Sequence, residues 1–460
     1  SAKKQSDFYG NGARIYVDTG SHLEYATGEV MGAFEAVIHE KAGERIVESA
    51  VVNANEHPYF KERGFVLRSF KNNKDNNKDG QNYTYGSHEN YCMLREKIHG
   101  RGGIANTMLR LLAPFRISSK LFAGNGWLEE ENGRLEYRLS QRAEEMKEST
   151  GSTTTTSRPI INMRDEPHAD EEQYYRLHLI DGDALLVEPA LFLKFGATLL
   201  VLDMIESGFL TGKPFGNGDD FVKALHAFSA DSTLRVAPNI GGKTYTIINI
   251  QEEYFKWANQ FCETSGSTPE QRLVLKLGEE ILTLAKKPEP HVLLAPYVDW
   301  AEKQLLMERE MEKWGYDWST PSTTKLPEKI AGRAAEEDEA ILLPEQIAAQ
   351  KIKNPPTLFH VLKSMDFQFH ENSPRGLARI LEKREFSKRI VSDEEITRAI
   401  THPSNSTRAL PRTLWNKKLL AEGKNPEQIE MNWKYVAYRA SKLVMRFDNP
   451  YDTDPKFPVR

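Results

Sequence analysis

Strict alternation of side chains between residues 13 and 18 is the feature that most constrains how this chain folds. The segment alternates apolar with polar residues, in the order Ala13, Arg14, Ile15, Tyr16, Val17, Asp18. Successive side chains of a strand point to opposite faces. The pattern therefore predicts a strand with one apolar face, whose other face carries a cation, a phenol and a carboxylate.

A second carboxylate follows this strand in the sequence. Glu24 comes after Asp18 across a Gly20-Ser21 turn signal, which predicts that the chain folds back and brings the two acids together. Two acids beside an arginine suit the binding of a metal-bound phosphate and the placing of a general base. A half-exposed edge strand with an ordinary ion pair explains the same residues equally well.

Bulk composition narrows the class of protein. A length of 460 residues predicts one large domain with a smaller one, or two comparable domains. The formal net charge of -5 argues against a dedicated nucleic-acid binder. Cys92 and Cys262 lie far apart without a metal-ligand pattern, so no disulfide framework or structural zinc site is expected and a reduced cytoplasm fits best. No apolar run approaches the length of a membrane helix and no signal peptide is visible at the start, so we expect a soluble protein without a membrane partner.

The spacing of apolar residues predicts a chain rich in helices. Helical spacing indicates helices at 29–54, 189–207, 251–264, 269–285 and 296–314, with Gly208 ending the second. Strands are predicted at 65–70, 83–93, 118–123 and 135–140, the last two joined by an Asn132-Gly133 turn.

Polar segments interrupt these elements. The Asn-rich segment 71–80 is predicted to be an exposed loop, and the Thr-rich segment 149–156 is predicted to be either a plain linker or a functional loop. Residues 319–356 are predicted to form a surface excursion. Ser392 and Glu395 match a capping box, which predicts the start of a helix, and we place the boundary of a small C-terminal domain near this point.

Three further stretches hold dense polar groups. In 85–91, Glu89 is a candidate oxygen ligand for a hard cation, and a solvent-facing glutamate is the alternative. Charges around Pro167 are explained either by a site or by a charged helix entrance. Arg176 and His178 share one face of a predicted strand, although a single histidine is more often structural than a ligand.

Familiar nucleotide-binding motifs are missing from the sequence. Gly241-Gly242-Lys243-Thr244 resembles the end of a phosphate-binding loop, but Ala237 stands where that motif needs its first glycine. ATP, if it binds, is therefore expected on a sheet surface, with carboxylates holding magnesium and arginines offsetting the charge of the transferred phosphoryl group.

Several motifs in one order carry a resemblance to a known family. They are Asn11-Gly12-Ala13-Arg14-Ile15-Tyr16-Val17-Asp18 and the segments 21–27, 85–91, 140–143, 158–162 and 164–170. With them the chain resembles the Pup ligase and depupylase family, relatives of glutamine synthetase. The resemblance implies an α+β fold, with a glutamine synthetase-like large domain over 1–390 built on a mainly antiparallel curved sheet packed by helices. It also implies a small C-terminal domain over 391–460 that covers the nucleotide.

Carried over position by position, the resemblance implies roles for single residues. Asp18 corresponds to the catalytic base, Tyr16 and Glu24 to contributors to the magnesium site, Arg14 and Thr27 to contacts with ATP, and Trp433 to the tryptophan covering the nucleotide. Glu89, singled out above as an oxygen ligand, is the further candidate for the magnesium site.

The family's chemistry implies the cofactors and partners. Its ligase uses ATP to phosphorylate the side-chain carboxylate of the modifier's C-terminal glutamate, and a substrate lysine then attacks to form an isopeptide bond. ATP and Mg²⁺ are therefore the expected cofactors. The expected partners are a small Pup-like modifier, lysine-bearing protein substrates and, indirectly, a bacterial proteasome.

The choice between the two activities of the family depends on finer matches. Gly20-Ser21-His22, Thr156-Ser157-Arg158-Pro159 and the segment 448–451 resemble the ligase, whereas Ser87, where the ligase usually has Cys, resembles the depupylase. We therefore expect a ligase. The alternative is a hydrolase that deamidates the modifier's terminal glutamine or cleaves conjugates.

Departures from the family pattern leave a third reading open. Family chains carry a Gly-x-Glu-x-Glu strand that supplies magnesium ligands, and none precedes Asn11 here, so either the chain is truncated or the ligands come from elsewhere. An inactive, binding-only relative would also fit this departure. The segment 183–189 and the long 71–82 loop differ from the family as well, so a Pup analogue is an alternative modifier.

Overall fold

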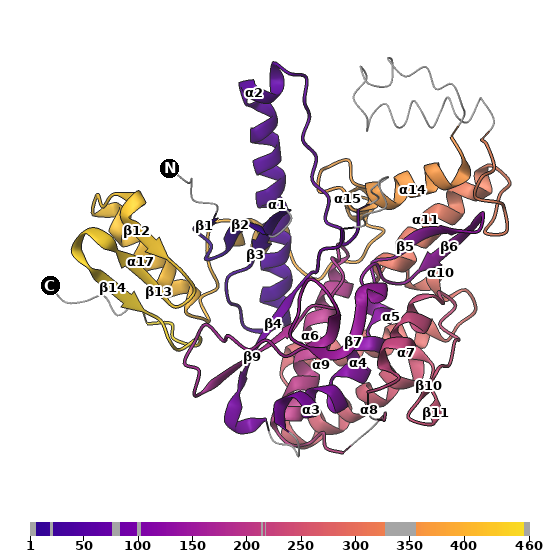
Figure 1. Ribbon diagram of the computed structural model, residues 1–460, viewed down its shortest axis with the longest axis horizontal. Coiled ribbons are helices and arrows are strands. Elements are labelled where there is room, and N and C mark those ends of the chain that lie inside the picture. The colour runs from indigo at the N-terminus through magenta and orange to yellow at the C-terminus, as the bar shows by residue number, and fades with distance from the viewer. Residues whose placement is uncertain are drawn as a thin grey trace.

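The computed structural model describes residues 6–18, 22–75, 83–98, 103–212, 215–216, 218–326 and 356–454. Figure 1 shows a larger, helix-rich body in which one long helix stands upright, and a smaller unit of three strands and a helix formed by the C-terminal part of the chain.

Helices make up most of the larger body. In the described residues they are α1 (Gly32–Glu56), α2 (Pro58–Lys61), α3 (Gly103–Leu111), α4 (Ala113–Ser118), α5 (Lys120–Ala123), α6 (Glu188–Glu206), α7 (Phe221–Ser229), α8 (Ile247–Ser265), α9 (Pro269–Ala285), α10 (Pro290–Leu294), α11 (Asp299–Lys313), α14 (Leu358–Phe369), α15 (Leu377–Lys383), α16 (Asp393–Ala399) and α17 (Ala409–Ala421). The predicted helices therefore exist, and the positive φ of Gly208 and the capping box of Ser392 confirm the predicted end of α6 and start of α16.

Strands form several small sheets. They are β1 (Ser6–Phe8), β2 (Arg14–Asp18), β3 (His22–Ala26), β4 (Glu89–Leu94), β5 (Trp127–Glu131), β6 (Arg134–Arg138), β7 (Met146–Gly151), β8 (Arg158–Asn162), β9 (Tyr174–Leu179), β10 (Asn239–Ile240), β11 (Lys243–Thr244), β12 (Ile429–Met431), β13 (Tyr435–Tyr438) and β14 (Leu443–Arg446). The sheet orders are β1-β2-β3, β4-β9-β8-β7 and β12-β13-β14, with hairpins β5-β6 and β10-β11. Among these pairs only β7 and β8 run parallel, which agrees with the expected mainly antiparallel α+β fold.

The sheet β1-β2-β3 lies between α1 and the C-terminal unit (Figure 1). On the α1 side, the ring of Tyr25 in β3 occupies the space where a side chain at Gly43 would stand. On the other side, Phe8 of β1 meets the ring of Trp433, with ring centroids 5.0 Å apart. The strand predicted from residues 13–18 is therefore held in place by two parts of the chain distant from it in sequence.

Two separate apolar cores hold the molecule together. The main core includes most of the buried residues from Ala33 to Ala399, and the second consists of Trp415, Leu419, Ile429, Val436 and Phe447. Helix α16 belongs to the main core through Ile396 and Ala399. Residues 391–400 thus pack with the larger body, and the boundary at 391 stays a prediction.

Three local expectations were wrong. Residues 65–69 form no strand and Phe70 makes only a single bridge, to Glu371. Residues 120–123 are helical, and the Asn132-Gly133 turn instead joins β5 to β6. Helices α4 and α5 are buried on every side, so their sequence lacks the periodicity that distinguishes a helix from a buried strand.

The start of the Asn-rich segment also differs from its prediction. Asn73 is only 1% exposed, and its side-chain oxygen accepts a hydrogen bond from the backbone of Ala184 (2.7 Å) and another from Asn125 (2.8 Å). Buried polar side chains of this kind satisfy backbone groups that water cannot reach. Residues 76–82 and 327–355 of the predicted loops lie outside the described residues.

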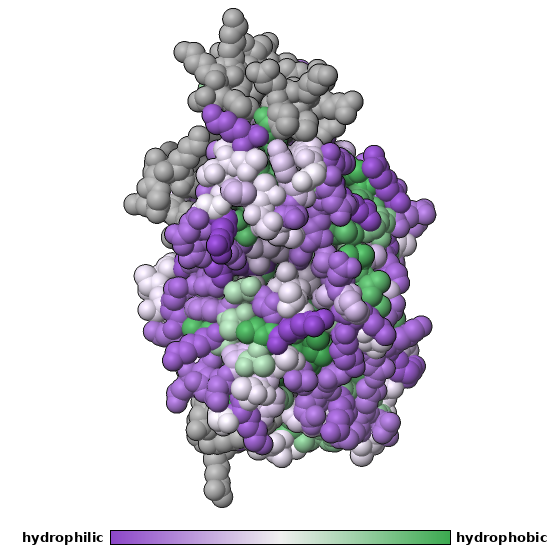
Figure 2. Space-filling view, turned by 90° about the vertical axis from the view of Figure 1, so that its right-hand side faces the viewer, coloured by the Kyte–Doolittle hydropathy of each residue, from purple (hydrophilic) through white to green (hydrophobic). Residues whose placement is uncertain are grey.

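Within the described residues, no helix has the length and apolar character needed to cross a bilayer. The face shown in Figure 2 is mostly hydrophilic, with small separate hydrophobic patches.

Candidate active site

One face of the sheet β1-β2-β3 gathers the polar residues predicted from the sequence. Strand β3 pairs with β2 so that Tyr16 lies opposite Glu24 and Asp18 lies opposite His22. Directly opposite residues of paired strands have their side chains on the same face. The predicted fold-back is therefore confirmed, and it brings Glu24 beside Tyr16 and Asp18.

The carboxylate of Glu24 is half-buried beside a second acid, Asp18. Burial raises its pKa, the neighbouring Asp18 raises it further, and the hydrogen bond that it accepts from the Tyr16 hydroxyl lowers it. Burial and Glu24 also raise the pKa of Tyr16. A cation bound here would relieve the repulsion between the two acids.

The oxygen atoms of this face fit a magnesium ion. Mg²⁺ binds through one or two carboxylates, substrate phosphates and water, so it needs no complete cage of protein ligands. In the part of the chain that the structure describes, no group of three or more His, Cys, Asp and Glu side chains comes together. Glu24 and Tyr16 are half-buried, and Asp18 is exposed at the end of β2.

An aromatic and cationic wall closes one end of the same face. The guanidinium of Arg14 lies 4.8 Å from the centre of the Tyr16 ring and 5.9 Å from that of Phe8. Phe8 in turn contacts Trp433 edge to face, at an interplanar angle of 77°. Thr27 directly follows β3. It lies at this end of the face because its neighbour Ala26 pairs with Arg14. Rings and guanidinium groups of this kind suit a nucleotide base and its phosphates.

Glu89 lies elsewhere, in a buried ion-pair network. It is 4% exposed, and its carboxylate oxygens accept bonds from Arg116 (2.7 Å) and from the Tyr91 hydroxyl (2.6 Å). The alternative of a solvent-facing glutamate is therefore wrong. Both oxygens already accept hydrogen bonds from donors, so Glu89 is poorly placed to bind a metal ion.

A second polar face lies on the sheet β4-β9-β8-β7. Asn90, His178 and Asn162 are in register across three strands, and Arg176 lies two residues from His178 on β9. The His178 Nδ1 and Arg176 Nε atoms are buried without a hydrogen-bond partner among the described residues. Burial, followed by the charges of Arg176 and Arg164, lowers the pKa of His178 to about 4.

This second face carries the charge of Arg176, and the segment before β4 touches the first sheet. The Arg176 guanidinium carries the positive charge that a phosphate or carboxylate needs, and it donates to Asn90 (3.2 Å) and to the Asp165 carbonyl (3.3 Å). The ring of Tyr85, just before β4, lies 4.0 Å from that of His22 in β3. Arg176 and His178 share this face as their two-residue spacing predicts, although the spacing alone assigns them no role. The helix entrance proposed around Pro167 is wrong, because this segment is the loop between β8 and β9.

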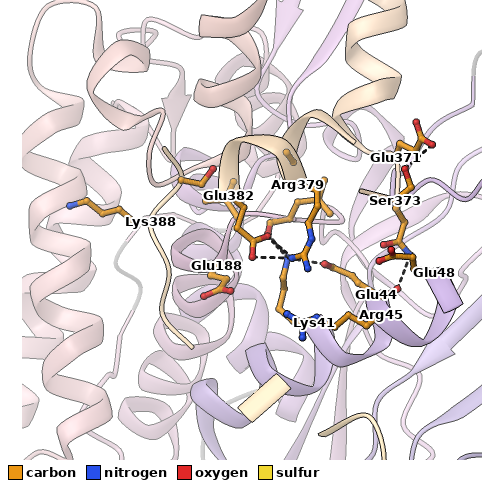
Figure 3. Close-up of a pocket in the computed structure, with 15 residues that line it drawn as sticks. Lys41, Glu44, Arg45, Glu48, Glu188, Glu371, Ser373, Arg379, Glu382 and Lys388 are labelled. Atoms are coloured by element: carbon orange, nitrogen blue, oxygen red, sulfur yellow. Dashed lines mark hydrogen bonds and ion pairs between the residues drawn. The ribbon is translucent and has the colours of Figure 1, made fainter. Parts of the chain in front are cut away.

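A charged pocket between α1 and α15 is a weaker candidate for the active site than these two faces (Figure 3). Its volume of about 30 Å³ holds only one or two water molecules. The Lys41 ammonium pairs with Glu44 (2.7 Å) and Glu382 (3.7 Å), and Arg379 also pairs with Glu382 (2.9 Å). These four charged side chains therefore compensate one another inside the pocket.

Comparison with known proteins places the chain among relatives of one kind. The family model described as Pup-ligase protein matches residues 1–328 and 348–437. The chain is 34% identical to a Pup–protein ligase of Kineococcus radiotolerans and 32% identical to one of Mycolicibacterium smegmatis, in each case over 87% of this chain and 78% of the relative.

Solved structures give the same result. A Pup ligase, PafA, in complex with ADP superimposes with a TM-score of 0.79 at 27% identity, covering 98% of this chain and 88% of the other. The complex between the protein Pup and its ligase PafA matches with a TM-score of 0.78, covering 98% of this chain and 81% of the other.

Proposed function

The chain belongs to the Pup-ligase family, and we propose that it uses ATP to join a small Pup-like modifier to lysines of other proteins. Its α+β fold is that of its structural relatives, which are glutamine synthetase-like. One observation supports the proposal at the level of single residues: Arg14, Tyr16, Asp18 and Glu24 share one face of two paired strands.

Asp18 is the proposed catalytic base. It is an exposed carboxylate on the same face as the buried Glu24, so a protein substrate can reach it from solvent. A lysine ammonium must lose a proton before its nitrogen can attack, and Asp18 is placed to accept that proton. The amine then forms a bond to the activated carbonyl carbon of the modifier's glutamate, and phosphate leaves.

The nucleotide site is proposed at the aromatic wall. Arg14 and Thr27 would contact ATP, and Trp433 would cover it from the C-terminal unit. Magnesium, when bound, offsets the negative charge of the phosphates during transfer. Tyr16 and Glu24 are the residues proposed to hold it, since a cation relieves the charge that raises the pKa of Glu24.

The second face is proposed to receive the modifier's end. Arg176 and His178 each hold one buried nitrogen atom without a partner among the described residues, and the Arg176 cation suits the carboxylate that is phosphorylated or the phosphoryl group it acquires. The segment before β4 contacts the first sheet, because the ring of Tyr85 lies 4.0 Å from that of His22.

The wider setting of the reaction follows from the family. We propose that the conjugates are directed to a bacterial proteasome and that the enzyme acts in the cytoplasm. ATP supply and free thiols both suit that compartment, and Cys92 and Cys262 are free.

The proposal is tested by incubating the purified chain with ATP, magnesium, a Pup-like modifier ending in glutamate, and a lysine-bearing protein. A conjugate of the summed mass is expected by mass spectrometry. The Asp18→Asn variant should lower the rate by at least about 100-fold, as expected for loss of a general base. Asp219→Asn, an exposed aspartate in the turn before α7, is the matched control and should keep the wild-type rate.

Two outcomes would overturn this assignment. An Asp18→Asn enzyme that conjugates at the wild-type rate would remove Asp18 from the role of base. Release of free modifier from a preformed conjugate, without ATP consumption and without any ligation, would instead identify the hydrolase of the same family.

A further inference from the structure

Glu29, which no motif singled out, lies where the C-terminal unit meets the nucleotide face. It follows β3 and precedes α1. Its carboxylate accepts two bonds from Arg412, each 2.7 Å long, and one of 2.8 Å from Arg408. Both arginines are almost fully buried, at 0% and 3% exposure. A buried arginine pair of this kind depends on its carboxylate, because without it two cations would remain uncompensated.

Arg412 also contacts the aromatic rings of Phe8 and Trp433. Its guanidinium lies 5.1 Å from the centre of the Trp433 ring and 5.4 Å from that of Phe8. The same group donates to the backbone carbonyl of Trp433 (3.1 Å) and to that of Gly12, just before β2 (3.2 Å). One side chain therefore joins the tryptophan to the strand that carries Arg14 and Tyr16.

Arg408 completes the connection on the other side. It donates to the carbonyl of Phe447 in the C-terminal unit (2.9 Å) and to that of His168 in the β8–β9 loop (2.7 Å). Glu29 is thus the common acceptor for two arginines that together contact the residue before β2, the β8–β9 loop and the C-terminal unit.

We propose that Glu29 is a positioning residue that sets nucleotide affinity by holding Arg412, and through it Trp433, against β2. This inference rests on the proposed nucleotide site but not on the identity of the modifier. Although burial raises it, Arg412 and Arg408 hold the pKa of Glu29 at about 2, so the carboxylate is charged throughout the neutral range.

The test is nucleotide binding by calorimetry together with steady-state kinetics, with the full chain. Glu29→Gln keeps the size of the side chain but removes its charge. We expect the dissociation constant and the KM for ATP to rise by about tenfold or more. The kcat at saturating ATP should stay within about twofold, since no reacting atom is touched. Glu29→Asp, which keeps the charge, should recover part of the affinity.

Glu171→Gln is the matched control. Glu171 also faces the C-terminal unit, through a pair of 3.7 Å with Lys434, but it is 73% exposed and contacts neither arginine. An exposed pair of this kind contributes little, so its loss should leave ATP affinity unchanged. Unchanged ATP affinity in Glu29→Gln, or an equal loss in both variants, would overturn the proposal.

A double variant separates positioning from a general structural defect. If Glu29 acts through Trp433, combining Glu29→Gln with Trp433→Ala should weaken ATP binding by less than the product of the two single effects. Multiplying effects would contradict this connection. Nucleotide binding needs no modifier, so a wild-type chain that binds ATP but forms no conjugate would refute the proposed function while leaving this inference intact.

Discussion

At the scale of the residue, one hydrogen bond between Tyr16 and Glu24 affects the charge of the proposed metal site. The Tyr16 hydroxyl donates to Glu24 and lowers its pKa, against burial and Asp18, which both raise it. Loss of the hydroxyl leaves Glu24 protonated to a higher pH. A protonated carboxyl is a poor ligand for a hard cation.

Tyr16→Phe should therefore weaken divalent cation binding, and more strongly at pH 6 than at pH 8. The folded-state pKa of Glu24 is raised, so its charge is lost as the pH falls through that higher value. We expect about tenfold weaker binding near pH 6. Titration with Mn²⁺ as the probe, in the presence of ADP at several pH values, measures the effect.

Tyr9→Phe provides the control for this experiment. Tyr9 is 38% exposed and lies next to β1, outside the Tyr16–Glu24 pair. Its variant should bind the cation like the wild type at each pH. If Tyr16→Phe shows the same loss at pH 6 and pH 8, then the hydroxyl acts only by direct coordination and the argument from the pKa of Glu24 fails.

At the scale of the element, a single glycine decides how closely β3 approaches α1. A side chain at Gly43 would stand 2.3 Å from a ring carbon of Tyr25, which is closer than carbon atoms can pack. Tyr25 precedes Ala26 and follows Glu24 on β3, so a displaced ring moves the carboxylate face with it. The absence of a side chain in the middle of α1 is therefore linked to the geometry of the candidate site.

Gly43→Ala should lower both the melting temperature and the conjugation rate. Alanine is the better helix former by about 1 kcal/mol, so a helix without this contact would be stabilised by the change. We expect instead a melting temperature lower by several degrees, because overpacking displaces the ring. Calorimetry and the conjugation assay check both effects, with Ser49→Ala on the exposed side of α1 as control. A higher melting temperature would show that the ring moves aside freely.

At the scale of the whole molecule, the pH dependence of stability follows from buried acidic residues. They lie where α11 contacts segments distant in sequence. Burial, together with Asp299 and Glu382, raises the pKa of Glu302 to about 8, and its Oε2 atom has no partner among the described residues. Its other oxygen accepts from the Ser387 hydroxyl (2.5 Å). The folded state therefore keeps a proton that the unfolded chain releases above the ordinary value of 4.5.

The sign of the effect follows from this proton. Where the folded state binds more protons than the unfolded state, stability falls as the pH rises, here between about 4.5 and 8. Glu302→Gln mimics the protonated group, so it should raise the melting temperature at pH 8.5 by at least about 2 °C and leave it nearly unchanged at pH 5. Thermal unfolding at both pH values tests this. Glu312→Gln, exposed on the same helix, should shift neither, and an equal shift at both pH values in Glu302→Gln would contradict the argument.

The sequence by itself determined the features that depend on local geometry. The alternation along residues 14–18 placed Arg14, Tyr16 and Asp18 on one face, since a strand has a period of two wherever it lies. Helical spacing, Gly208 and the Ser392 capping box likewise located helices and their ends. The family motifs indicated the activity, because several of them occur in one order along the chain.

Only the tertiary structure decided which side chains meet across long stretches of chain. Glu89 had the chemistry of a metal ligand, but Arg116 of a different element satisfies its carboxylate. Glu29 carried no motif, yet folding places it between Arg408 and Arg412. The physical reason is that desolvation and pairing depend on three-dimensional neighbours, whereas strand and helix periods depend on the residues next in line.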